Sequence, residues 1–203
     1  MSELPEIRIR HSRLMTRSIS TSLIKYHRGP DAEVSELEVY LKKADAYRDG
    51  WKVKEQAILS GMTNELGLNF YLPVIDATLA PMVPTFSTPL TLNYRFTPDE
   101  FIDALTHELI HILLSDNIYS ISFEHLKMEQ WPNENDKTRN HILVHAVLAF
   151  IDTETLAEPA RMERDSMSCH DNPPYRRAWE IVKEQGYRPV IELIKAEVMK
   201  SRS

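Results

Sequence analysis

The sequence predicts a single α+β domain, and three observations lead to that fold class. Short segments of alternating polarity, typical of strands, lie in the N-terminal half, and segments of helical periodicity surround them. The chain has 203 residues, 42% of them hydrophobic, which is enough to bury one sizeable core. No low-complexity linker divides the sequence, so we expect one domain over residues 1–203 with its core at about 31–157.

The first expected elements are a short strand and a long helix. Residues 5–10 alternate as a half-buried strand does. Asp31 is the expected N-cap of the helix, which Gly50 can interrupt and which Gly67 ends. The apolar stripe of this helix consists of Val34, Leu37, Leu41, Ala44, Tyr47, Trp51, Ile58, Leu59 and Met62.

Two further strands are expected before the middle of the chain. Residues 68–74 are rich in strand-forming side chains, and Pro73 favours the edge of a sheet. Pro81 and Pro84 punctuate an irregular stretch, which predicts a loop that could rim a cleft. The alternation of residues 90–96 predicts the next strand.

A helix with a strong start signal follows this strand. Thr97 is the expected N-cap, Pro98 takes the first helical position, and Glu100 completes a capping box. Residues 115–117 provide the expected stop. The wide apolar surface of this helix predicts that it is largely buried, and it comprises Phe101, Ile102, Leu105, Leu109, Ile110, Leu113 and Leu114.

The second half of the chain is expected to be helical. A helix is predicted from about Lys137 to Thr155, with Asp136 as its N-cap, after a turn-rich stretch. A C-terminal helical segment is predicted at about 174–200, and Gly186 divides it into a hairpin. This hairpin could cover a cleft or hold an oligomer, and the sequence does not separate the two.

The helix that starts at Thr97 carries the motif HExxH at residues 107–111. Positions i and i+4 lie on one helical face, so His107 and His111 can both reach one Zn²⁺. Glu108 can then deprotonate a zinc-bound water without taking a coordination position. The alternative is a pair of core histidines bonded to backbone, with Glu108 in solvent. A metal is favoured because two histidines and a glutamate in an apolar helix need partners.

With this motif on a capped helix after a strand, residues 68 to 157 resemble the zincin metallopeptidases, in particular compact gluzincin-like domains. The resemblance implies a zinc ion on His107 and His111, with Glu108 as general base. It also implies an edge strand before the motif helix and an extended substrate along the sheet edge. The sequence departs from gluzincins at the third ligand, because the interior of the next helix holds no glutamate.

That next helix offers His141 and His145 instead, again four residues apart. Antiparallel packing of the two helices would bring the two pairs face to face, which predicts a histidine-rich zinc site. We expect His145 as the third metal ligand, because it lies deeper in the apolar run, and His141 as a donor that stabilises the oxyanion or orients the substrate. The two roles could be reversed. Asp103 and Asp152 are candidate partners of the ligand imidazoles.

Other residues are weaker candidates for this chemistry. The carboxylates of Glu134, Glu154 and Glu158 are expected to be solvated surface groups. The pair Cys169-His170 could bind metal, but a free thiol is the preferred interpretation. Further oxyanion donors could come from the tyrosines, for each of which a structural role is preferred: Tyr94, Tyr119 and Tyr175.

The sequence therefore predicts a zinc-dependent hydrolase, with a metallopeptidase acting on a peptide or protein as the first hypothesis. Two alternatives stay open. One is a zinc amidohydrolase that performs deformylation or deacylation, and the other is a noncatalytic zinc-stabilised interaction domain, which four closed ligands would indicate.

Composition narrows the setting of this function. The N-terminus has no long apolar run, no segment is apolar enough to span a membrane, and a lone cysteine has no partner, so a cytoplasmic protein is expected. The net charge of −6 makes nucleic acid an unlikely partner, although the first thirty residues are locally basic. Oligomeric state is not predicted.

Overall fold

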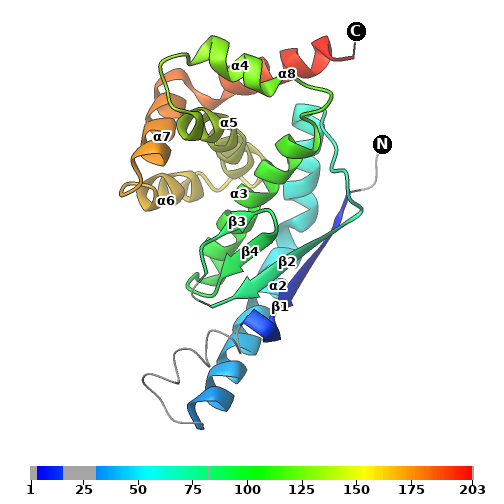
Figure 1. The fold of residues 1–203 in the computed structure, drawn as a ribbon, viewed down its shortest axis with the longest axis vertical. Helices are drawn as coiled ribbons and strands as arrows, with labels where there is room; N and C mark the ends of the chain where they lie inside the picture. Colours follow the sequence, from blue (N-terminus) through cyan, green and yellow to red (C-terminus); the bar gives the residue numbers. More distant parts are fainter. Residues whose placement is uncertain (1–3, 16–30, 82, 203) are drawn as a thin grey trace. The chain divides into compact units, whose positions relative to one another are not determined.

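The computed structural model describes residues 4–15, 31–81 and 83–202, with the backbone alone for residues 31–36 (Figure 1). Two compact units divide the chain. The sheet unit comprises Pro5–Glu55 and Leu72–Glu108, and the helical unit comprises Met1–Leu4, Gln56–Tyr71 and Leu109–Ser203. Both strands and helices are present, which confirms the α+β class. A single domain over the whole chain stays a prediction.

A mixed sheet forms the centre of the sheet unit (Figure 1). Its strands are β1 (Glu6–His11), β2 (Val74–Ala80), β3 (Phe86–Ser87) and β4 (Leu90–Asn93), in the spatial order β1-β2-β4-β3. The first three in that order are parallel to their neighbours, and β3 is antiparallel to β4. The strand predicted at residues 5–10 is therefore confirmed as β1, one residue later.

Two strand predictions need correction. Residues 68–74 do not form a strand, and β2 begins at Val74, where the predicted strand would end. The side chain of Leu68 is buried but that of Tyr71 is 81% exposed, so this apolar run is a connection rather than a half-buried strand. The strand before the motif helix is β4, and it is not at the edge because β3 lies beyond it.

Helix α2 (Asp31–Leu66) continues through Gly50 without a break. A Cβ atom at Gly50 would lie 3.5 Å from the Ile102 side chain, an ordinary van der Waals distance, so the packing of α2 on the motif helix does not require glycine at this position. Tyr47 stacks on Phe101 with ring centroids 4.1 Å apart, and its hydroxyl donates to the Phe96 carbonyl at 2.6 Å. Tyr47, one residue of the predicted apolar stripe, thus anchors α2 to the start of the motif helix, whereas Leu41 of the same stripe is 37% exposed and the side chain of Val34 lies outside the described residues.

Gly67 and Gly186 end helices as predicted. Gly67 follows α2 with a φ of 66°, and Gly186 separates the two C-terminal helices with a φ of 83°. Both values lie in the left-handed region, which side chains disfavour and glycine adopts freely.

The motif helix α3 (Pro98–Asp116) starts at the predicted capping box. The Thr97 backbone N–H donates to the Glu100 carboxylate at 2.8 Å, and the Glu100 backbone N–H donates to the Thr97 hydroxyl at 3.3 Å. The helix runs through both units, because its residues to Glu108 belong to the sheet unit and those from Leu109 to the helical unit. His107 and His111 are therefore held by one continuous helix.

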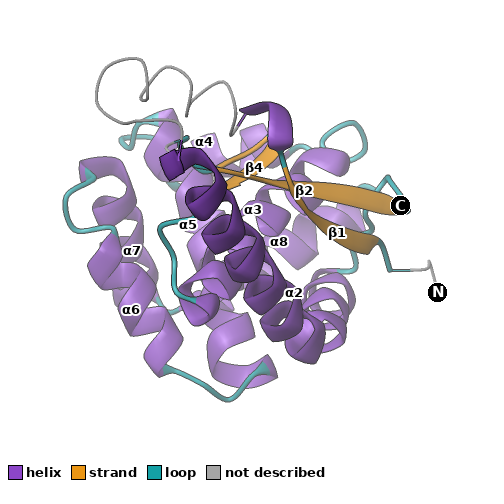
Figure 2. Cartoon of the chain, turned by 90° about the horizontal axis from the view of Figure 1, so that it is seen from below, coloured by secondary structure: helices purple, strands orange, loops and turns teal. Residues whose placement is uncertain are grey.

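Helix α5 (Asp136–Phe150), labelled in Figure 2, belongs to the helical unit. Most of its side chains are buried. Its N-cap is Asn135 rather than the predicted Asp136, because the Asn135 side chain accepts from the Thr138 N–H at 2.9 Å. Asp136 instead pairs with Arg139 in the first turn. Helices α4 and α6 were not predicted. The remaining helical elements are α4 (Phe123–Gln130), the π-helical turn η1 (Ile151–Thr155), α6 (Ala160–Ser168), α7 (Pro173–Gln185) and α8 (Tyr187–Lys200).

The predicted C-terminal hairpin is confirmed as α7 and α8. Helices α6 and α7 lie side by side (Figures 1 and 2), where Lys183 pairs with Glu163 at 2.7 Å. Across the described part of the chain, no helix is both long enough and apolar enough to cross a membrane. Most of the predicted basic segment, residues 16–30, lies outside the described residues, as does the side chain of Asp31.

Candidate metal centre

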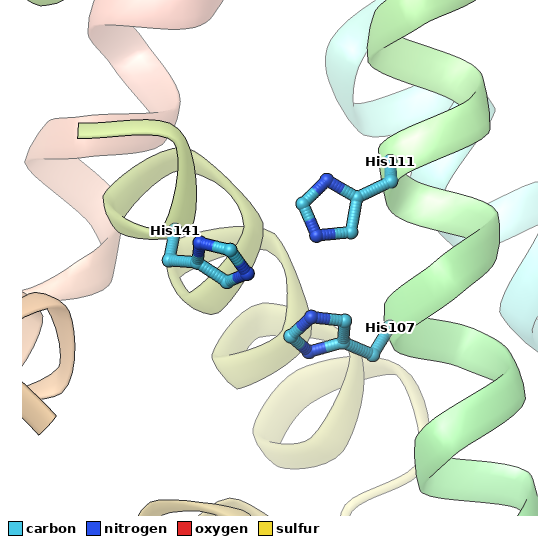
Figure 3. A group of neighbouring side chains, drawn as sticks. All are labelled: His107, His111 and His141. Atoms are coloured by element: carbon cyan, nitrogen blue, oxygen red, sulfur yellow. The ribbon is translucent and has the colours of Figure 1, made fainter. Parts of the chain in front are cut away.

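Helices α3 and α5 bring three histidines together. His107 and His111 lie one turn apart on α3, and His141 lies on the first half of α5. Their rings point toward one another in Figure 3, and the His111 and His141 ring centroids are 4.9 Å apart at an interplanar angle of 72°. One nitrogen from each imidazole lies within 4.8 Å of the others. We refer to His107, His111 and His141 as the histidine triad.

The histidine triad fits a zinc ion by the chemistry of its donors. Zinc binds imidazole nitrogen at about 2.0–2.1 Å in tetrahedral geometry, so ligand nitrogens around it lie roughly 3.4 Å apart. The three donor nitrogens lie within 4.8 Å of one another, at most about 1.4 Å wider than that spacing. Three protein ligands also leave a fourth position for water, as catalytic zinc sites require.

A backbone hydrogen bond fixes the tautomer of His141. Its Nδ1 lies 2.7 Å from the Lys137 carbonyl oxygen, which can only accept a hydrogen bond. Nδ1 therefore carries the proton, and Nε2 keeps the lone pair that a metal needs. Metal-bound histidines in proteins are oriented in the same way by an outer hydrogen bond to a carbonyl or carboxylate.

Burial keeps two of these imidazoles neutral. It lowers the pKa of His111 to about 4, with smaller contributions from His141 and from the Lys127 ammonium. Burial likewise lowers the pKa of His141 to about 4, against the opposing effect of the Lys137 carbonyl. Both rings are consequently unprotonated at neutral pH, which is the state that binds metal.

Glu108 is a buried carboxyl group on α3 between the two motif histidines. Burial alone raises the pKa of its carboxyl to about 7, close to the value at which a base both ionises and accepts a proton near neutral pH. Among the described residues, Glu108 belongs to neither group of side chains whose spacing suits a metal. The predicted division of labour between two ligands and one base stays a prediction.

A second group of donors contains His107 again, together with His145 and Asp165. His145 is fully buried and stacks on Trp179, with centroids 4.4 Å apart and an angle of 12° between the rings. Trp179 also donates from Nε1 to the Asp165 carboxylate at 2.9 Å. The two groups share His107, and neither combines His145 with both motif histidines. The identity of the third ligand stays a prediction.

Asp165 and Trp179 are the residues that the sequence analysis did not find. Asp165 lies on α6, a helix that was not predicted, and Trp179 was expected only to anchor the C-terminal hairpin. Neither has a fixed spacing from HExxH that could have revealed it. Their proximity to His145 comes from the packing of α6 and α7 against α5.

Among the three tyrosine candidates, only Tyr175 contacts a member of the histidine triad. Its ring lies on that of His141, with centroids 3.7 Å apart. The Tyr94 hydroxyl is 2.6 Å from Nδ1 of His11 in the sheet unit, and Tyr119 is 98% exposed. Tyr175 is therefore the tyrosine to consider at the candidate centre.

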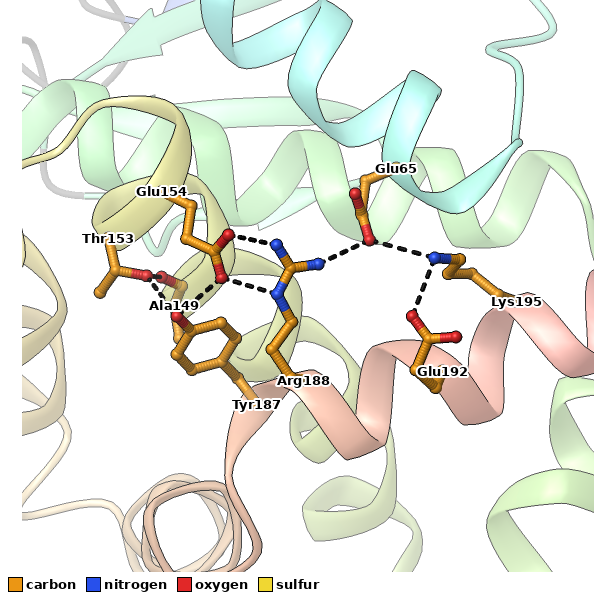
Figure 4. A network of polar contacts seen from close by, with 8 residues as sticks. All are labelled: Glu65, Ala149, Thr153, Glu154, Tyr187, Arg188, Glu192 and Lys195. Carbon is orange, nitrogen blue, oxygen red and sulfur yellow. Dashed lines mark hydrogen bonds and ion pairs between the residues drawn. The ribbon is translucent and has the colours of Figure 1, made fainter.

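The alternative carboxylate ligands form ion pairs on the helical unit. Glu134 pairs with Arg177 at 3.0 Å, and Glu158 pairs with Arg161. Glu154 pairs with Arg188, which also reaches Glu65 at 2.8 Å in the polar network drawn in Figure 4. Their roles as solvated surface groups stay predictions, and the Glu134 side chain is only 20% exposed.

The remaining candidates are buried acids and the cysteine. Asp103 and Asp152 are both buried, and their predicted roles beside the ligand imidazoles stay predictions. Burial, followed by the nearby Asp165 carboxylate, raises the pKa of Cys169 to about 12. That thiol is consequently a poor source of the thiolate that binds metal.

No protein-family model matches the chain, and no curated protein and no solved structure matches it either. The metal centre is therefore interpreted from its own residues and geometry.

Proposed function

We propose that this protein is a zinc-dependent hydrolase that cleaves amide bonds, and specifically a metallopeptidase acting on a peptide or protein. One observation carries the proposal. The hydrogen bond from His141 Nδ1 to the Lys137 carbonyl leaves the Nε2 lone pair of this buried imidazole available to a metal. His141 belongs to the same group of possible metal ligands as the two histidines of HExxH. A structural histidine pair would not need a third imidazole within the same few ångströms.

In this proposal the zinc ligands are His107, His111 and His141, which reverses the preferred order of His141 and His145. When bound there, zinc would lower the pKa of a water molecule from about 15.7 towards about 7 and polarise the scissile carbonyl. The Lys137 carbonyl holds the His141 ring in its orientation. His145 then lies behind this layer, stacked on Trp179, where Asp165 completes a polar group around it.

Glu108 performs the proton transfers of the proposed mechanism. Its carboxylate takes the proton from the attacking water and later delivers it to the departing amine. A pKa of about 7 suits both steps, because the group gains and loses a proton near neutral pH. Tyr175, in contact with His141, is the nearest candidate for a donor to the developing oxyanion.

The direct test combines metal analysis with the substitution Glu108→Gln. The wild-type protein is expected to bind one zinc ion per chain and to hydrolyse peptides, and the variant to keep the zinc and lose activity by at least about 10³-fold. Glu129→Gln, at an exposed site on α4, is the matched control and should leave both unchanged. Peptidase activity that survives Glu108→Gln, or a wild-type protein without zinc, would contradict the proposal.

A noncatalytic zinc site is the second candidate, and the donor group that contains His145 favours it. If His145 or Asp165 supplied a fourth ligand, the metal would have no position for water. Cobalt substitution distinguishes the two, because the visible spectrum of a site with exchangeable water changes with pH, and that of a closed four-ligand site does not.

A further inference from the structure

A small cavity adjoins His111 within the helical unit. It has a volume of about 220 Å³, and its walls come from the end of α3, from α4 and from α5. This is below the roughly 300–1,000 Å³ of pockets that enclose drug-sized ligands, so it suits one side chain rather than a whole small molecule. Because His111 lines the cavity, an occupant would lie next to the candidate metal centre.

Half of the residues that line the cavity are apolar, and the other half are polar or charged. Leu114, Phe123, Leu143 and Val144 are buried, and the half-exposed Ile118 lies among the lining residues as well. Burying a large apolar side chain against these residues favours binding because it removes apolar surface from water. The apolar half of the lining therefore suits a bulky apolar side chain, and the polar half suits a polar group attached to it.

The lining of the cavity includes one lysine, Lys127. The Lys127 side chain is 7% exposed, and its ammonium donates to the Glu124 carboxylate at 2.5 Å and to the Asn140 side-chain oxygen. Glu124 is 83% exposed, so the ammonium is held in place while its carboxylate partner extends into solvent. Because Glu124 is a solvated side chain, a substrate carboxylate can take its place on the Lys127 ammonium.

The position of Lys127 links the cavity to the metal centre. Lys127 and His111 line the same cavity. The second partner of Lys127, Asn140, directly precedes His141 on α5. The backbone atoms of a substrate residue bound in the cavity would thus lie close to both Lys127 and the histidine triad.

We propose that the cavity binds a bulky apolar side chain of the substrate and that Lys127 binds the carboxylate of that same residue in place of Glu124. Preferred substrates then end in a residue such as phenylalanine or leucine. That the occupant is a substrate rests on the proposed function, whereas the binding of an apolar carboxylate to the cavity does not.

The binding test uses N-acetyl-L-phenylalanine and its uncharged analogue N-acetyl-L-phenylalaninamide, titrated by calorimetry into zinc-loaded and chelator-treated protein. The carboxylate is expected to bind about 10-fold more tightly than the amide in both forms, because a charge-assisted hydrogen bond is roughly twice as strong as a neutral one. Equal affinities in chelator-treated protein would overturn the role of Lys127, since the metal alone would then account for any preference.

Three substitutions separate the parts of the site. Lys127→Met should abolish the preference for the carboxylate. Glu124→Gln, at an exposed position, should tighten carboxylate binding several-fold because it removes the competing group, and no change there would also overturn the proposal. Ser115→Phe should weaken both probes by narrowing the cavity, whereas Ser120→Phe, exposed and outside the lining, should not.

Hydrolysis assays then distinguish this inference from the proposed function. Peptides that end in phenylalanine are compared with the same peptides amidated at the C-terminus. If the probes bind as expected but neither peptide is cleaved, the proposed function fails and the binding site stands. If both peptides are cleaved equally by zinc-loaded protein, the hydrolase stands and the specificity assigned to Lys127 is wrong.

Discussion

Helices α3 and α5 each carry two histidines four residues apart, but their environments differ. On α3, His107 and His111 belong to one donor set. On α5, His141 belongs to that set and is held by the carbonyl of Lys137, whereas His145 stacks on Trp179 and belongs to the second group. The i, i+4 spacing places two side chains on one face. The spacing does not decide whether the two histidines bind the same ion, because each can contact different residues of neighbouring helices.

The largest expected effect breaks the α5 pair directly. His141→Ala should lower zinc affinity by more than the 10–100-fold typical of changes outside the ligand layer, whereas His145→Ala should stay within that range. Competition with a chromophoric chelator measures both affinities. His125→Ala, at an exposed position on α4, is the matched control. A larger loss of zinc in His145→Ala would restore the preference of the sequence analysis for His145.

The surroundings of His145 can be removed without touching a proposed ligand. Trp179→Ala is expected to lower the free energy of unfolding by about 3–5 kcal/mol, because it removes a fully buried indole and its contact with His145. Denaturant unfolding measures this loss, and Tyr119→Ala, at a 98% exposed residue, should cost less than about 0.5 kcal/mol. The folded variant should keep its zinc, and loss of zinc would place His145 among the ligands.

On α3, the buried Glu108 makes the free energy of unfolding of the metal-free protein depend on pH. The pKa of Glu108 is raised from 4.5 to about 7 in the folded state, so the folded protein binds more protons than the unfolded chain between these values. The contribution of Glu108 to stability is then lost as the pH rises from 4.5 through 7.

Glu108→Gln removes this term. Above pH 7 the variant should be more stable than the wild type, by on the order of 1–3 kcal/mol, and below pH 4.5 the difference should vanish. Urea unfolding across this pH range measures the difference. A constant difference at all pH values would show that the carboxyl is not buried as described.

The smallest expected effects concern the starts of the two helices. Thr97→Ala and Asn135→Ala should each lower the free energy of unfolding by about 1 kcal/mol, because each removes a side chain that accepts a backbone N–H at the N-cap. Ser122→Ala, at the start of α4, is the control, since its side chain makes no capping hydrogen bond. An equal loss in all three variants would mean that capping is not the cause.

Features that depend on residues close together in the chain could be predicted from the sequence, and features that depend on distant residues could not. The capping box at Thr97, the long α2 and the stops at Gly67 and Gly186 were predicted because their signals lie within a few residues of each other. The strand expected at residues 68–74 was wrong because strand propensity depends on neighbouring strands, and here the run is an exposed connection. Helices α4 and α6 were missed because both are short and polar.

By itself, the sequence determined the HExxH helix, the second histidine pair and the α+β class, because helical periodicity and capping are local properties. Only the tertiary structure decided which histidines share a donor set, since that depends on the placement of α5 beside α3 and on the tautomer fixed by Lys137. It alone also placed Trp179 and Asp165 beside His145 and Lys127 in the cavity beside His111. These contacts join residues far apart in the chain, and no spacing in the sequence encodes them.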